Sequence, residues 1–411
     1  MMSDSSAERD NLYYDPYDYA IDAQAQTVWR RLRDDSPLYW NEKYGFYALS
    51  RYDDVLRAVL DTATFSSAHG TTAEAMGPEP TPLRMMIFMD PPEHTWHRKV
   101  VNRAFTPKTV AVLESRVVDL CGMLLDQFQG REEVDLLEEY GAVVPPSVIL
   151  ALLGFPPGFE KEWRQSVDSM LSVPGAPAER SAEQTSLEML SGESFTSGLF
   201  QLLPDLLTSR RADPSDDLIS VLVQTDLEEN GHRRKLTDEE IFSFVLLLSA
   251  AGTETVARLL GWALTLLDRR PAQRGELAAD PTLIPNAIEE CLRYEAPSPV
   301  NGRWVNDDVE FHGEVIPRHS KVLLLNGSGN RDERHFADPN SFDIHRRIDR
   351  HLSFGYGPHF CVGAALARME GHVALRELLR RYPTWQIDYE GAQMVHTSTV
   401  RGYAKLPASI M

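Results

Sequence analysis

A cysteine on a glycine-rich turn is the feature of this chain that most clearly suggests chemistry. Residues 354–363 read Phe-Gly-Tyr-Gly-Pro-His-Phe-Cys-Val-Gly, and a helix is predicted directly after them, over 364–379. Cys361 would then stand near a helix N-terminus, where unpaired backbone N–H groups and the helix dipole favour the thiolate. Gly355 and Gly357 permit turn conformations that a side chain would block. The turn is therefore predicted to present a thiolate that can ligate iron.

Gly363 would let the start of that helix lie close against a flat group, which we interpret as haem. The other two cysteines, Cys121 and Cys291, fall in helical runs without a glycine turn and fit small buried apolar residues. A zinc site is also conceivable, with the ligands Cys361, His345, His351 and His359. Structural zinc uses four ligands in two short-spaced pairs, and the spacing of these residues is wrong for that.

A long helix is predicted in the middle of the chain. Thr237 and Glu240 form a capping box, and apolar periodicity then runs through Leu267 to a stop before Pro271. About 30 residues at 1.5 Å each give roughly 45 Å, enough to cross the whole domain. Because it is apolar on most faces, this helix is predicted to be central.

A polar island interrupts the apolar helix at residues 249–255, Ser-Ala-Ala-Gly-Thr-Glu-Thr. One interpretation is a helix kink in which the Thr255 hydroxyl bonds back to a carbonyl. The other is a locally opened helix that admits a small ligand, with Glu254 and Thr255 side by side to deliver protons. The island alone does not decide between them.

A basic pair is predicted near residue 90. Asp90 followed by two prolines and Glu93 indicates a helix start with Asp90 as its cap, which places His94 and Arg98 one turn apart on the same face. The pair is either a clamp for a carboxylate or phosphate, or an ordinary solvated basic edge.

Composition predicts an ordinary globular protein. The 411 residues are 43% hydrophobic and 25% charged, with no linker or repeat, so we expect one domain over 1–411 with about the first 15 residues flexible. A net charge of -20 argues against nucleic acid or an anionic membrane as partner. Without signal-peptide features, a spanning segment or a disulfide framework, we expect a cytoplasmic protein.

The predicted fold is mainly α with small peripheral β-sheets. Strand patterns occur at 38–41, 45–50, 309–316 and 322–325, whereas most other segments have helical periodicity. One further helix, over 284–294, carries Glu290 and Arg293 on one face. Such a pair is a weak signal by itself.

Four features occur here in the order found in the cytochrome P450 superfamily: the His/Arg pair, the acid-alcohol island, the Glu-x-x-Arg helix and the cysteine turn. The chain resembles the soluble bacterial members from about residue 37 to 407, and the cysteine turn matches the pattern Phe-Gly-x-Gly-x-His-x-Cys-x-Gly at every fixed position. Thr253 departs from the family, because many relatives have His there. Trp96 and Val256 are further departures that remove no group the mechanism needs.

The resemblance implies the cytochrome P450 fold, with the long helix over a haem b. It implies that Cys361 is the proximal ligand of the iron and that Thr255, with Glu254 beside it, relays protons for dioxygen activation. Haem propionate contacts would come from His94, Arg98, Arg303 and His359. Glu290 and Arg293 would form a buried cluster with Arg346.

The resemblance also implies a reaction, a substrate class and electron donors. We expect hydroxylation or epoxidation of an apolar or amphipathic small molecule, in secondary metabolism, with electrons from a ferredoxin and a ferredoxin reductase. Oxidative coupling or ring formation on the same haem is the alternative, and a non-catalytic haem sensor or carrier is a third possibility. Substrate contacts are expected from residues 66–88, 170–195, 244–255, 297–301 and 398–400.

A basic docking face for the ferredoxin is one interpretation of five cationic residues near the cysteine side: Arg103, Lys108, Arg347, Arg350 and Arg368. An ordinary solvated surface is the other.

Overall fold

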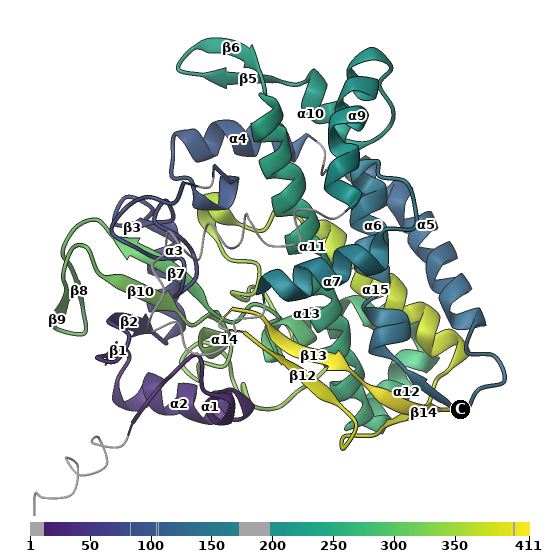
Figure 1. The fold of residues 1–411 in the computed structure, drawn as a ribbon. Coiled ribbons are helices and arrows are strands. Elements are labelled where there is room, and N and C mark those ends of the chain that lie inside the picture. Colours follow the sequence, from purple (N-terminus) through teal and green to yellow (C-terminus); the bar gives the residue numbers. More distant parts are fainter. Residues whose placement is uncertain (1–11, 83, 104, 106, 172–197, 398) are drawn as a thin grey trace, which may run out of the picture.

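The structure is a computed structural model that describes residues 12–82, 84–103, 105, 107–171, 198–397 and 399–411. Most helices lie at one side of the long helix α11 (Asp238–Asp268) and the largest sheet lies at the other, while smaller strand pairs lie at the top and at the lower edge of the view (Figure 1). This arrangement confirms the predicted mainly helical fold with small peripheral sheets.

The helices have the following bounds: α1 (Tyr19–Ala23), α2 (Ala25–Asp35), α3 (Tyr52–Leu60), α4 (Glu93–Asn102), α5 (Pro107–Asp126), α6 (Val144–Leu153), α7 (Glu160–Leu171), α9 (Gly198–Ala212), α10 (Leu218–Gln224), α11 (Asp238–Asp268), α12 (Pro271–Ala279), α13 (Ile284–Tyr294), α14 (Asn326–Gly329) and α15 (Ala364–Arg381). Short 3₁₀ turns are η2 (Met86–Phe88), η5 (Pro281–Leu283) and η6 (Gly357–His359), and η3 (Leu137–Gly141) is a π-helical turn.

The strands are β1 (Leu38–Asn41), β2 (Phe46–Leu49), β3 (Phe65–Ser66), β4 (Glu133–Asp135), β5 (Asp226–Glu229), β6 (His232–Lys235), β7 (Asn301–Val305), β8 (Val309–Phe311), β9 (Glu314–Ile316), β10 (Lys321–Leu324), β11 (Trp385–Ile387), β12 (Gln393–His396), β13 (Arg401–Lys405) and β14 (Pro407–Ile410). The largest sheet has the order β1-β2-β10-β7-β3, in which only β2 and β10 run parallel.

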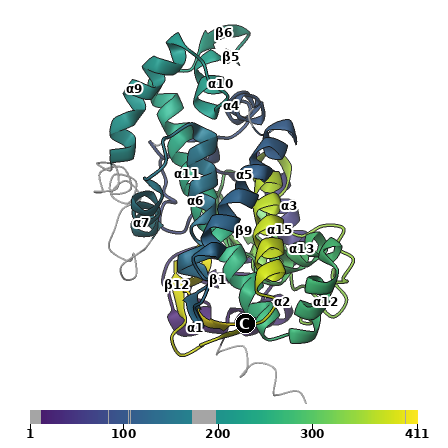
Figure 2. The same cartoon turned by 90° about the vertical axis from the view of Figure 1, so that its right-hand side faces the viewer.

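The helix α11 confirms the predicted central helix. Thr237 caps it, and the reciprocal bonds of the capping box with Glu240 are both present. Helices α6, α7, α13 and α15 all pack against it, and Figure 2 shows it in the middle of the helical layer. By length and composition α11 could cross a membrane, but most of its apolar stretch is buried inside the protein, as for any long core helix.

Residues 309–316 form two strands, so the prediction of one strand there was wrong. His312 and Gly313 have positive φ angles of 55° and 81°, which close a tight turn between β8 and β9. Asn and His tolerate this region better than most residues, and glycine adopts it freely. The apolar residues that suggested one strand therefore belong to two strands, one on each side of this turn.

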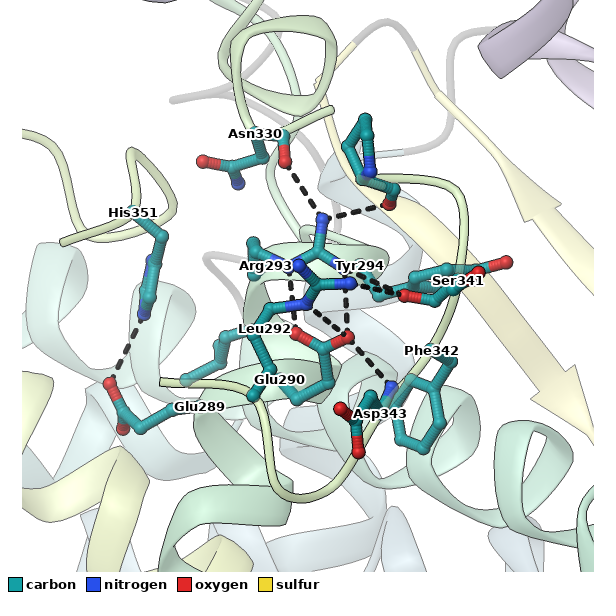
Figure 3. Close-up of polar contacts among 12 residues, drawn as sticks. Glu289, Glu290, Leu292, Arg293, Tyr294, Asn330, Ser341, Phe342, Asp343 and His351 are labelled. Carbon is teal, nitrogen blue, oxygen red and sulfur yellow. Dashed lines mark hydrogen bonds and ion pairs between the residues drawn. The ribbon is translucent and has the colours of Figure 1, made fainter. Parts of the chain in front are cut away.

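The contacts of Glu290 confirm the predicted buried cluster of Glu290 and Arg293 with Arg346. The Glu290 carboxylate accepts from Arg293 at 2.7 and 2.8 Å and from Arg346 Nε at 3.2 Å, and Glu290 and Arg293 are fully buried. Figure 3 shows how Arg293 also reaches the carbonyls of Asn330 and Ser341. Because every charge has a partner, this network fixes the loop that precedes the cysteine turn.

Candidate active site

A cavity of about 310 Å³ lies between α11 and the cysteine turn. Leu247, Ala251, Thr255 and Leu259 line it from α11. Residues of the turn and of the start of α15 form the opposite wall, namely Phe354, Gly355, Tyr356, Cys361, Val362, Gly363, Leu366, Ala367 and Glu370. The sequence thus brings two distant motifs to facing walls of one space.

Cys361 is held on this wall by its backbone, because its N–H donates to the Phe354 carbonyl at 2.8 Å. Gly355 and Gly357 adopt positive φ angles of 65° and 67°, as the turn was predicted to need. Burial raises the pKa of the Cys361 thiol, although the Gly363 N–H and two arginines, Arg98 and Arg368, pull it downward. The predicted effect of the helix terminus is present in the Gly363 N–H, which favours the thiolate, but desolvation outweighs it; a bound metal cation would reverse that balance.

The alternative of a zinc site finds no support. No group of three or more metal-ligating side chains occurs among the described residues. His345 pairs with Glu276 at 2.8 Å, and His351 pairs with Glu289 at 3.2 Å. Cys361 is therefore the thiolate candidate for a site in which iron has its other ligands from a cofactor.

Four nitrogen-bearing side chains meet at one end of the cavity: His94, Arg98, Arg303 and His359. The rings of His94 and His359 lie 4.2 Å apart between centroids. Both ring nitrogens of His94 and Nε2 of His359 are buried without a hydrogen-bond partner. Buried polar atoms are normally paired, so this end of the cavity is built for a ligand rich in acceptors.

The pKa values of His94, His359 and Arg303 are all lowered, mainly because burial disfavours the charged form of each group. Burial, followed by the charge of Arg98, lowers the pKa of His94 to about 4. Burial lowers the pKa of His359 to about 3, with Arg303 as the next cause. Burial also lowers the pKa of Arg303 to about 10. Two carboxylates would relieve each of these shifts, so the residues fit the propionates of a haem.

Asp90 does not cap the following helix, contrary to the prediction. Helix α4 begins at Glu93 with Pro92 in the cap position, so Asp90 lies outside its first turn. The Asp90 carboxylate instead accepts from the Ser66 hydroxyl at 2.5 Å and from the Ser67 N–H at 2.8 Å. It thereby fastens the segment before the propionate-binding end of the cavity to β3.

Thr255 and Glu254 are neighbours on α11, but their side chains point in different directions. Thr255 is half-buried on the cavity wall, and its hydroxyl donates to the Ala251 carbonyl at 2.8 Å. Glu254 is only 3% exposed, is absent from the cavity lining, and forms an ion pair with Arg258. Arg258 also donates to the Tyr403 carbonyl on β13. Sequence reasoning did not include Arg258, although a Glu–Arg pair four residues apart was a readable signal.

The polar island does not break α11, which is continuous over Asp238–Asp268. The back-bond of Thr255 expected from the first interpretation is present, and Thr255 lines the cavity as the second expected, but the helix is not opened and Glu254 does not lie beside Thr255 on the cavity wall. Gly252 packs closely against α6: a Cβ there would lie 3.3 Å from Cγ1 of Ile149, so a side chain at this position would require Ile149 to shift slightly.

Three of the five segments expected to contact substrate supply cavity residues. These are Thr71, Met86 and Ile87; the α11 residues; and Pro297, Ser298 and Asn301. Most of segment 170–195 lies outside the described residues, as does Ser398, and neither Thr399 nor Val400 lines the cavity. The methionines in and beside the first of these segments, Met76, Met85, Met86 and Met89, are all at least 92% buried.

Two of the five cationic residues considered for a basic docking face are paired with carboxylates. Arg368 binds the Glu289 carboxylate at 2.6 and 2.9 Å. Arg347 lies 3.4 Å from Asp349 in a fully solvated pair, and Arg103 and Arg350 are exposed. The side chain of Lys108 lies outside the described residues.

Comparisons with known proteins agree with this geometry. The family model described as "Cytochrome P450" matches residues 193–280 and 277–400. The chain is 36% identical over 404 residues to "Putative cytochrome P450 123" of Mycobacterium tuberculosis, covering 97% of each chain. It is 35% identical over 323 residues to the "6-deoxyerythronolide B hydroxylase" of Saccharopolyspora erythraea, covering 78% of this chain and 76% of that protein.

A solved structure shares the whole architecture. Cytochrome P450 CYP109Q5 from Chondromyces apiculatus superposes with a TM-score of 0.85 and 34% identity, covering 97% of this chain and 98% of that chain. With a 36% identical relative matched over nearly the full length and a family model matching half of the sequence, the chain belongs to the cytochrome P450 family of haem-thiolate monooxygenases.

Proposed function

We propose that this protein uses haem b and dioxygen to hydroxylate or epoxidise an apolar or amphipathic small molecule. The observation that carries the proposal is one cavity with Cys361 on one wall, Thr255 on the facing helix, and at one end His94, Arg98, Arg303 and His359, of which the two histidines have buried ring nitrogens without a hydrogen-bond partner. The chemistry of this donor set matches a flat iron porphyrin with two carboxylates.

When bound, the haem would supply dioxygen activation, which a thiolate ligand promotes by donating electron density to iron. The protein's own residues would hold and orient this group. Cys361 would ligate the iron, and His94, Arg98, Arg303 and His359 would bind the propionates. Thr255 moves a proton through its hydroxyl, which the Ala251 carbonyl orients at 2.8 Å. Glu254 contributes a proton only after it exchanges its contact with Arg258 for one toward Thr255.

The lining of the cavity supports an apolar substrate with a few polar groups. Met86, Ile87 and Leu247 provide apolar contacts, while Thr71, Ser298 and Asn301 provide hydroxyl and amide groups. Pockets of this kind bind by apolar area and orient by a few hydrogen bonds. A relative is named for hydroxylating 6-deoxyerythronolide B, which supports a secondary metabolite of that chemical type as the substrate.

Electrons must reach the haem from outside, and we propose a ferredoxin with its reductase as donors in the cytoplasm. Arg350 is exposed and its guanidinium lies over the ring of Tyr356 in the turn that carries Cys361, and the exposed Arg347 is three residues before it, so an acidic partner has cationic contacts there despite the net charge of -20.

The reaction can be tested with ¹⁸O₂ once a library of apolar compounds yields one that is turned over. Monooxygenation predicts one labelled oxygen atom in the product, whereas a product without label would favour the alternative of oxidative coupling. Thr255→Ala should keep haem binding but divert electrons to hydrogen peroxide, and Thr255→Ser, which retains a hydroxyl, should remain coupled. An unchanged ratio of product to NADPH in Thr255→Ala would contradict the assigned role of Thr255.

A further inference from the structure

A buried tryptophan, Trp163 of α7, contacts the turn of α11 formed by residues 249–255. Trp163 is fully buried, and its indole Nε1–H lies 3.3 Å from the Ser249 carbonyl and 3.2 Å from the Thr253 hydroxyl oxygen. The Thr253 hydroxyl itself donates to the Ser249 carbonyl at 2.7 Å. The indole N–H from α7 and the Ser249 carbonyl and Thr253 hydroxyl from α11 therefore meet at one point.

The turn held in this way is the turn that carries Thr255. Thr253 is fully buried on the α7 side, whereas Ala251 and Thr255 lie on the cavity side of the same turn. Ser249 adds a further back-bond, from its hydroxyl to the Val245 carbonyl at 2.6 Å. Hydroxyl groups that bond back to carbonyls compete with the helix ladder and tend to bend a helix.

Two outside contacts compensate for this local weakening. Trp163 satisfies the Ser249 carbonyl from α7, and Ile149 of α6 packs closely against Gly252. A carbonyl oxygen has two lone pairs, so the Ser249 carbonyl cannot form full bonds with both side-chain donors and with the helix, and the indole N–H is shared between this oxygen and the Thr253 hydroxyl. The position of the turn is therefore set by α6 and α7 as well as by the helix itself.

We propose that Trp163, acting through Thr253, is a positioning residue that holds the 249–255 turn so that the Thr255 hydroxyl faces the reacting centre. The hydroxyl of Thr253 is the partner that this role requires, at the position where many relatives have His. The proposal rests on the proposed function only in what Thr255 does. The mechanical coupling between α7 and this turn stands independently of it.

The chain contains a matched control for the indole contact. Trp385 is 2% exposed and also donates from Nε1 to a carbonyl of α11, that of Leu264, at 3.2 Å. Leu264 does not line the cavity. Trp385→Phe therefore removes the same kind of bond from the same helix at a distance from the site.

Hydrogen exchange with mass spectrometry on the haem-bound protein tests the coupling directly. Trp163→Phe and Thr253→Val should each speed exchange of the amides of residues 253–257 about tenfold, the effect of losing one net hydrogen bond, with 260–268 unchanged. Trp385→Phe should show the opposite distribution, and Thr253→Ser, which keeps the hydroxyl, should match wild type. Unchanged exchange at 253–257 in Trp163→Phe, or uniform acceleration along α11, would overturn the proposal.

A second readout separates positioning from the identity of the reaction. With any compound that is turned over, Trp163→Phe and Thr253→Val should raise the peroxide fraction in the direction of Thr255→Ala, and Trp385→Phe should not. If exchange at 253–257 changes and Thr255→Ala raises the peroxide fraction, but Trp163→Phe and Thr253→Val do not raise it, the mechanical coupling stands but Trp163 does not position Thr255, and the proposal fails. If Thr255→Ala itself leaves the peroxide fraction unchanged, the proposed role of Thr255 fails instead. If neither exchange at 253–257 nor the peroxide fraction changes in Trp163→Phe and Thr253→Val, the proposal also fails.

Discussion

Glu254 and Thr255 are neighbours in the sequence but face different sides of α11, with Thr255 on the cavity wall and Glu254 buried against Arg258. Neighbouring positions on a helix point about 100° apart, so an acid-alcohol pair cannot place both groups on one narrow face. The ion pair with Arg258 gives the Glu254 carboxylate a charged partner on the side away from the cavity.

Removing Arg258 should destabilise the protein strongly. Arg258→Met leaves the Glu254 carboxylate buried without its ion-pair partner, which typically costs about 3–5 kcal/mol in the free energy of unfolding. Denaturant unfolding measures this change, and the double variant Glu254→Gln with Arg258→Met should recover much of it. The exposed pair Arg30–Asp34 has the same four-residue spacing, and Arg30→Met should cost less than about 1 kcal/mol. Equal losses in the two arginine variants would refute the distinction.

Replacing Arg303 should weaken haem retention. Arg303→Gln removes a buried positive charge from the end of the cavity assigned to the propionates, and a charged hydrogen bond lost there predicts about 10- to 100-fold faster haem transfer to apomyoglobin. Arg347→Gln is the control, since the side chain of Arg347 is 91% exposed. Equal transfer rates for the two variants would remove Arg303 from the cofactor site.

Glu370 should make the protein less stable as the pH rises. It is 2% exposed on the cavity wall with Oε2 unpartnered, and burial raises its pKa well above the ordinary 4.5. The folded state therefore holds a proton that the unfolded state releases above about pH 4.5, so stability falls as pH rises from there to the folded-state pKa. Glu370→Gln should have a higher Tm than wild type at pH 8, with a smaller difference at pH 5. A constant difference would show that Glu370 does not titrate in this way.

Reduction by an acidic ferredoxin should depend on Arg347 and Arg350. Reversing both charges should lower the reduction rate about tenfold at low salt and flatten its dependence on ionic strength, because steering by charge is lost. Arg131→Glu breaks another exposed pair, with Glu139 of η3, and should leave the rate unchanged. An unaltered rate and salt slope in the double reversal would indicate an ordinary solvated surface.

Local sequence signals were sufficient for the elements that carry their own pattern. The capping box of α11, the helix α13 and the glycine turn around Cys361 were all predicted from neighbouring residues. The strand β7, which carries Arg303, was missed. Its sequence contains Gly302, and its strand form depends on pairing with β10, in which Arg303 opposes Val322.

Contacts between distant elements explain the remaining differences. The direction of Glu254 is set by Arg258 and by the carbonyl of Tyr403, almost 150 residues away in sequence. The net rise in the pKa of Cys361 follows from burial, which no local motif reports. The contact of Trp163 with the 249–253 turn likewise requires knowing how α7 packs on α11.

The most direct test of the central claim is the absorption spectrum of the reduced, purified protein with carbon monoxide, measured beside Cys361→Ser. Thiolate ligation by Cys361 predicts a strongly red-shifted Soret band in the wild type and its loss in the variant. A band at the position usual for imidazole ligation, or a red-shifted band that survives in Cys361→Ser, would contradict the assignment of Cys361 as the iron ligand.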